Sequence, residues 1–171
     1  DAIEVLAEAK RRYDYDPERV YLTGHSMGGH GAWHVGLTFP DLFGAVGPSA
    51  GWVSFASYGG GPAGEPASPL AALLARARTP SDTLALVRNA ALHGVYILHG
   101  ADDDNVPAAQ AHALDAALAE FHRDYVFHEE TGMGHWWDLS DEPGADCVDW
   151  PPLFDFFARH ARPAADALRR V

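Results

Sequence analysis

Hydrophobic residues are arranged along this chain in two different patterns. Over the first 13 residues, apolar side chains recur every three or four positions with charged residues between them. This spacing predicts an amphipathic helix, which the turn at residues 14–17 ends. The run 19–23 is instead continuous, β-branched and aromatic, and it leads directly into Gly24. Such a run is typical of a strand buried in a parallel sheet.

The remaining pattern repeats this alternation of strand and helix. Many Gly, Pro and Ser residues at 48–69 predict a long irregular loop, followed by short helices at 70–77 and 81–91. Further strands are expected at 42–46, 95–98 and 125–128, and further helices at 27–39, 107–121 and 150–162. We therefore predict an α/β fold: a parallel sheet in a three-layer α/β/α sandwich, as one domain over residues 1–171 with an insertion at about 51–91.

Composition narrows the classes of partner. The 171 residues are 47% hydrophobic and 21% charged, with 24 acidic against 12 basic residues and a formal net charge of -12. This charge would repel nucleic acids and anionic membrane surfaces. No apolar run approaches the roughly 20 residues of a transmembrane helix, and no signal peptide pattern is present. The single cysteine, Cys147, excludes a disulfide within the chain, and we interpret it as structural. These features assign no cellular compartment.

The motif Gly24-His25-Ser26-Met27-Gly28 lies between an expected strand and an expected helix. A serine at such a sharp turn has its hydroxyl pushed out above the sheet, and glycines on both sides let neighbouring backbones approach. Ser26 is therefore the candidate nucleophile, and the Met27 amide at the helix N-terminus is a candidate oxyanion donor. The alternative is a glycine-rich turn with a capping serine. We expect His25 to pack under this turn.

A serine nucleophile needs a base and an acid later in the chain. Among the histidines that follow a plausible acid after Ser26, His135 alone falls in a glycine-containing loop after the last expected strand. The others, His112, His122, His128 and His160, fall in expected helices or strands. The acid is expected where the strand at 95–98 ends, but spacing alone leaves Asp102, Asp103 and Asp104 open. Their alternative role is a solvated turn that caps the next helix.

These motifs together resemble the α/β-hydrolase superfamily, specifically its prolyl oligopeptidase-like and esterase branch. The resemblance rests on Gly24 to Gly29, on His99-Gly100-x-x-Asp103-x-x-Val106-Pro107 and on Gly134-His135, which stand in the order that the superfamily has. It implies that Asp103 is the acid and that no cofactor is needed. It also implies that the chain is the C-terminal part of the fold. The strands before residue 1, or self-association, would then cover the sheet edge, and an earlier loop would supply the second oxyanion amide.

Other residues carry weaker signals. Trp52, Tyr58, Trp136 and Trp137 lie in expected loops near the strand ends, where they are a possible substrate pocket; core packing is the alternative for each. His30 and His34 are spaced like zinc ligands, but Gly31 stands where a metalloprotease has glutamate, so we predict packing and no metal.

The sequence thus predicts a serine hydrolase that cleaves a carboxylic ester through an acyl-enzyme intermediate, with Ser26, His135 and Asp103 as a triad. The first alternative is a serine peptidase of the prolyl oligopeptidase type acting on short peptides. The second is a hydrolase-like module that binds ligands without catalysis. The expected partner is a small-molecule ester or a short peptide.

Overall fold

The computed structural model describes residues 1–59, 68–142 and 146–162. In this part of the chain, parallel strands form one sheet in the order β1-β2-β3-β4, with β1 and β4 outermost. The strands are β1 (Tyr21–His25), β2 (Ala45–Ser49), β3 (Gly94–Gly100) and β4 (Tyr125–Glu130). The α-helices are α1 (Ala2–Arg12), α2 (Met27–Thr38), α3 (Phe55–Tyr58), α4 (Pro69–Arg78), α5 (Thr83–Leu86), α6 (Ala109–Ala119) and α7 (Pro151–Ala158), and the 3-10 helices are η1 (Thr79–Ser81) and η2 (Val87–Leu92).

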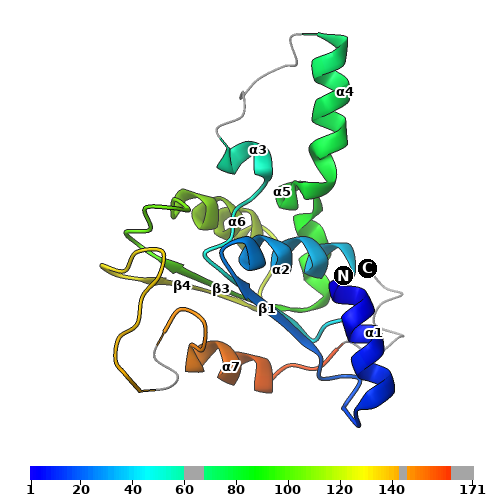
Figure 1. Ribbon diagram of the computed structural model, residues 1–171, viewed down its shortest axis with the longest axis vertical. Coiled ribbons are helices and arrows are strands. Elements are labelled where there is room, and N and C mark those ends of the chain that lie inside the picture. Colours follow the sequence, from blue (N-terminus) through cyan, green and yellow to red (C-terminus); the bar gives the residue numbers. More distant parts are fainter. Residues whose placement is uncertain (60–67, 143–145, 163–171) are drawn as a thin grey trace.

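Helices cover both faces of the sheet (Figure 1). Successive strand residues point to opposite faces, so Val95 and Ile97 of β3 join one apolar cluster while Tyr96 and Leu98 join the other. The first cluster packs under α2, η2 and α6, and includes Trp33 and Leu114. The second packs against α7. This arrangement confirms the predicted three-layer α/β/α architecture.

Two predicted elements differ from the structure. The strand expected at 42–46 is Ala45–Ser49, because the apolar residues before it form a turn whose Phe43 is buried in the core. Pro48 therefore lies within an inner strand, where it has no N–H to donate. The pairing of β2 with β3 joins Ala45, Val46 and Ser49 but skips the two residues between, whereas the pairing with β1 is continuous.

The prediction of a single helix at 81–91 is also wrong. It divides into α5 and the 3-10 helix η2, and both are tied to neighbouring segments by side-chain hydrogen bonds. The Thr83 hydroxyl donates to the Val53 carbonyl over 2.8 Å, and the Asn89 amide donates to the Leu37 carbonyl over 2.8 Å. These tertiary bonds outweigh helix propensity.

The last helix ends at Ala158 instead of 162, so His160 lies beyond it.

Helix α4 stands apart from the sheet (Figure 1). It has no buried residue, and Leu70, Leu73 and Leu74 are exposed on it. Within the described residues, no helix has the length and apolar character needed to cross a membrane.

Burial predicts opposite outcomes for two leucines. Leu114 on α6 is fully buried and Leu73 on α4 is 55% exposed. Leu114→Ala removes core contacts and leaves a cavity, so we expect it to lower the free energy of unfolding by about 2–5 kcal/mol. Leu73→Ala, the matched control, should change it by less than about 0.5 kcal/mol. Urea denaturation followed by circular dichroism measures both, and equal losses would contradict the assigned core.

Candidate active site

Ser26 occupies a strained turn between β1 and α2. Its φ of 58° and ψ of -117° are rare for a residue with a side chain. The turn is held in place by the Ser26 N–H, which donates to the Ser49 carbonyl at the end of β2 over 2.9 Å. The sheet therefore fixes a backbone conformation that the residue would not adopt alone.

The glycines of the G-x-S-x-G motif have different roles. A Cβ on Gly24 would lie 2.4 Å from the Gly28 carbonyl oxygen, so only glycine fits at position 24. A Cβ on Gly28, in contrast, would have no neighbour within 4 Å among the described residues. The two backbones approach closely as predicted, but of these two positions only 24 requires glycine for lack of space. The second tight position is Gly29, where a Cβ would lie 2.1 Å from the Ser49 carbonyl oxygen.

The Ser26 side chain does not cap helix α2. It makes no cap hydrogen bond, although Ser26 stands at the N-cap position. Its Oγ instead lies 2.8 Å from Nε2 of His135, to which the hydroxyl donates. The alternative of a capping serine is therefore wrong. Met27 follows as the first residue of α2, which puts its amide at the positive end of the helix dipole.

His135 connects Ser26 to one of the three adjacent aspartates. Its Nδ1 lies 2.8 Å from Oδ2 of Asp103, whose side chain is fully buried. The other Asp103 oxygen, Oδ1, accepts hydrogen bonds from the backbone N–H groups of Asn105 (2.9 Å) and Val106 (2.7 Å). Asp102 and Asp104 are exposed. These two hydrogen bonds to Asp103 were not predicted from the sequence. An aspartate in a turn often accepts hydrogen bonds from the backbone N–H groups two and three residues later, and this is the signal that could have indicated them.

The remaining candidate histidines bind elsewhere. His112 contacts Glu129, His128 contacts Glu130, His160 contacts Asp124, and His122 contacts the His93 carbonyl. His122 and His160 lie just beyond α6 and α7, and not within helices as predicted.

His25 packs beside the candidate site. Its Nδ1 lies 3.0 Å from the Ser49 hydroxyl, which donates to the Cys147 carbonyl. Its ring lies 4.9 Å from the ring of His135 and 4.2 Å from that of Trp136. Burial, with the neighbouring His135 as a second cause, lowers the pKa of His25 to about 4. His25 is therefore neutral near pH 7.

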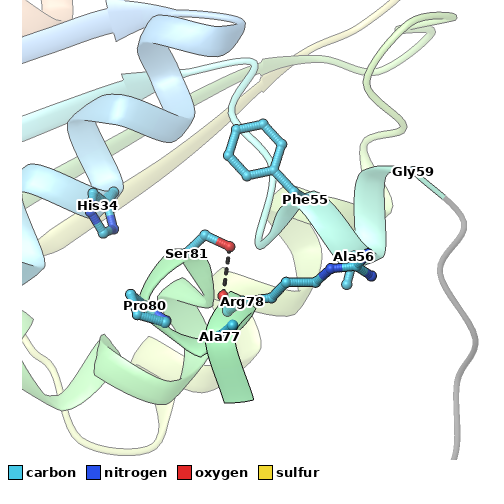
Figure 2. Close-up of a pocket in the computed structure, with 8 residues that line it drawn as sticks. All are labelled: His34, Phe55, Ala56, Gly59, Ala77, Arg78, Pro80 and Ser81. Atoms are coloured by element: carbon cyan, nitrogen blue, oxygen red, sulfur yellow. Dashed lines mark hydrogen bonds between the residues drawn. The ribbon is translucent and has the colours of Figure 1, made fainter. Parts of the chain in front are cut away.

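The aromatic residues of the expected pocket occupy two places. Trp52 is buried and stacks on His30 and Tyr58, while its neighbour Phe55 lines a cavity of about 610 Å³. Figure 2 shows this cavity, with His34, Arg78 and Ser81 on other sides of it. Trp136 and Trp137 line a second cavity of about 380 Å³. In the described residues no group of three or more potential ligands is placed to hold a metal ion, and His30 bonds to the Trp52 carbonyl.

A parallel sheet with helices on both faces, and a serine on a strained turn after a strand, define the α/β-hydrolase class of serine hydrolases. The comparisons with known proteins agree. The chain belongs to the prolyl oligopeptidase family, whose sequence profile matches residues 1–162.

Two proteins of similar sequence and one solved structure of similar fold show how far the similarity extends. An uncharacterized secreted protein of Arthroderma benhamiae is 35% identical over 123 residues, covering 68% of this chain and 13% of that protein. An S-formylglutathione hydrolase of Paracoccus denitrificans is 29% identical over 149 residues, covering 81% of this chain and 49% of that protein. A solved structure of an acylaminoacyl peptidase matches with a TM-score of 0.69 at 18% identity, over 94% of this chain and 27% of that chain. The chain spans half or less of each, and its sheet corresponds to the C-terminal portion of the fold.

The two motif glycines provide a test of the turn. Gly24→Ala places a methyl group against the Gly28 carbonyl, so we expect a fall of several degrees in the thermal midpoint. Gly28→Ala adds a methyl group in open space near the start of a helix. Alanine has less conformational freedom than glycine in the unfolded chain, so we expect the free energy of unfolding to rise by up to about 1 kcal/mol. Differential scanning calorimetry of both variants measures this. A Gly24→Ala protein as stable as the unmodified one would contradict the close approach.

Buried histidines predict destabilisation by acid. Burial lowers the pKa of His25, His30, His93, His99 and His122 below the unfolded value of 6.5. As the pH falls below 6.5, the unfolded chain binds protons that the folded chain binds only at lower pH, so the unfolded state gains stability. We expect the urea midpoint to fall steadily from pH 7 to pH 4. His25→Gln, which cannot titrate, should reduce this slope, and an unchanged slope would contradict the lowered pKa of His25.

Proposed function

We propose that this chain carries the catalytic residues of a serine hydrolase that cleaves carboxylic esters through an acyl-enzyme intermediate. The observation that carries the proposal is the continuous hydrogen-bonded series from Ser26 through His135 to the buried Asp103. A nucleophile, a base and an orienting acid in this order are the parts of a catalytic triad.

The geometry supports the following sequence of steps. Ser26 Oγ attacks the ester carbonyl carbon while its proton passes to His135 Nε2, and the carbonyl oxygen becomes an oxyanion that the Met27 amide stabilises. His135 then gives the proton to the leaving alcohol as the carbon–oxygen bond breaks. Water then attacks the acyl carbon while its proton passes to His135. The bond from that carbon to Ser26 Oγ breaks, the carboxylic acid leaves, and the proton from His135 restores the Ser26 hydroxyl. Asp103 holds the Nδ1–H of His135 throughout and balances the charge of the imidazolium. The steps use no metal or organic cofactor.

The similarity to S-formylglutathione hydrolase favours an ester over a peptide. That relative acts, by its name, on an S-acyl group, and an ester leaving group needs less acid assistance than an amine. The family name favours the other candidate, a serine peptidase acting on short peptides. A non-catalytic binding module would not need Ser26 to be held in a strained turn against His135.

Labelling and kinetics test the proposal. We expect a fluorophosphonate probe to label Ser26 and to leave Ser26→Ala unlabelled. Asp103→Asn should reduce kcat for p-nitrophenyl acetate by about 10⁴-fold, because the amide favours the wrong tautomer of His135. Asp104→Asn is the matched control: it removes the same charge one residue away on an exposed side chain and should retain activity.

The substrate class is decided by parallel assays. Hydrolysis of p-nitrophenyl acyl esters and of prolyl arylamides is measured with the same preparation. Activity on the arylamides alone would replace the esterase proposal by the peptidase, and an unlabelled Ser26 with labelled control enzymes would exclude both.

A further inference from the structure

Ser49, the last residue of β2, contacts both the turn of the candidate nucleophile and the segment that follows His135. Its carbonyl oxygen accepts the Ser26 N–H over 2.9 Å, and its hydroxyl donates to the Cys147 carbonyl over 2.9 Å. Ser49 and Cys147 are each only 3% exposed. One buried residue therefore joins the Ser26 turn to a segment 98 positions after it in the chain.

The segment after His135 folds back on itself, with an outgoing arm at 136–138 and a returning arm at 146–147. Asp138 and Asp146 form an antiparallel bridge, and the Cys147 N–H donates to the Trp137 carbonyl over 3.3 Å. The returning arm therefore lies beside the arm that leaves His135. Because the two arms are bonded to each other, a bond that fixes the Cys147 carbonyl to the end of β2 also restrains the backbone next to His135.

His25 contacts both arms. It is the last residue of β1 and lies opposite Ser49 in the register of the sheet. The centre of its ring lies 4.2 Å from that of Trp136 on the outgoing arm and 4.9 Å from that of His135. Its Nδ1 lies 3.0 Å from the Ser49 hydroxyl oxygen, which bonds to the returning arm. The ends of β1 and β2 thus hold the His135 segment together.

The available protons fix the direction of these hydrogen bonds. A serine hydroxyl has one proton and a carbonyl oxygen can only accept, so the Ser49 proton lies toward Cys147. The bond between Ser49 and His25 then requires a proton on Nδ1 of His25. Burial, with the neighbouring His135 as a second cause, lowers the pKa of His25 to about 4, so the ring is neutral near pH 7. Its single proton is therefore on Nδ1.

We propose that His25 and Ser49 are positioning residues of the candidate site: the hydrogen bonds from His25 Nδ1–H to Ser49 Oγ, and from the Ser49 hydroxyl to the Cys147 carbonyl, fix the segment after His135 to the strand ends that carry Ser26. This inference deepens the proposed function and rests on it. Asp103 holds the side chain of His135, whereas this pair holds the backbone segment. The pair acts through His135, so its loss should appear in kcat more than in KM.

Ser49→Ala removes the hydroxyl and keeps the carbonyl that accepts the Ser26 N–H. We expect kcat for p-nitrophenyl acetate, per folded protein as measured by circular dichroism, to fall about 10-fold with KM changed less than about twofold, because a loosened base reaches the reactive geometry less often. Thr23→Val is the matched control: it removes a hydroxyl that donates to the Gly47 carbonyl over 2.7 Å between the same two strands, and kcat should not change. An unchanged kcat in folded Ser49→Ala would overturn the proposal, because a role in stability alone changes only the folded fraction.

Two substitutions of similar size separate donation from packing at position 25. His25→Asn places an N–H at the same number of bonds from the backbone as Nδ1, whereas His25→Leu places a methyl group there, and both lack the ring. We expect kcat of the Asn variant to exceed that of the Leu variant about 5–10-fold. In a Ser49→Ala background this difference should disappear, because no hydroxyl remains to accept the bond. Equal kcat values for the two folded variants, or a difference that persists without the Ser49 hydroxyl, would overturn the proposal.

The tautomer of His25 can be measured in the unmodified protein. The ¹⁵N chemical shifts of its ring nitrogens should show the neutral Nδ1–H form throughout pH 5.5–8. The titratable groups that act on His25 are His135, Asp103, His99 and Asp146. An Nε2–H tautomer would mean that Ser49 donates to His25 and not to Cys147, and it would overturn the proposal. This result does not depend on turnover, so a protein with the expected tautomer and no hydrolysis would refute the proposed function and not the hydrogen bonds.

Discussion

Backbone hydrogen bonds that continue across the sheet beyond the strand ends position every part of the candidate site. A parallel ladder brings the carboxyl ends of its strands to one edge, and here hydrogen bonds also fix the first residue after β1, β2 and β3. The bonds run from Ser26 N–H to Ser49, from Ala50 N–H to Leu98, from Ala101 N–H to Glu130 and from Asp102 N–H to Met133. Because of them, the turns that carry Ser26, Asp103 and His135 begin at a common level. The strained conformation of Ser26 is one result of this constraint.

The layers of the fold could be predicted from the sequence because short continuous apolar runs, typical of buried strands, alternate along the chain with segments that suit helices. The sequence was not sufficient for the boundaries of β2. Leu42 and Phe43 are apolar because they pack against the core from a turn, and not because they belong to a strand. Pro48 lies inside β2, although proline is normally absent from inner strands. The division of residues 81–91 depends on hydrogen bonds to Val53 and Leu37, which are distant in sequence. Tertiary contacts of this kind leave no periodic signal.

The same distinction applies to the site. Ser26 was predicted from the G-x-S-x-G motif between an expected strand and an expected helix, and His135 because it falls in a glycine-containing loop after the last expected strand. The structure brings these two side chains within 2.8 Å of each other. Spacing left three aspartates open, and only the family resemblance favoured Asp103. The structure separates them by burial and by the two amides that bond to Asp103.

The separation of the site residues along the chain affects how the site forms. Ser26 and His135 are 109 positions apart, and Asp103 comes from a third turn. No segment that folds by itself contains the whole arrangement, so loop-closure entropy must be overcome and the sheet must be complete before the three side chains meet. We therefore expect reactivity at Ser26 to arise late during folding. A nascent or partly unfolded chain would carry an unactivated serine and remain chemically inert.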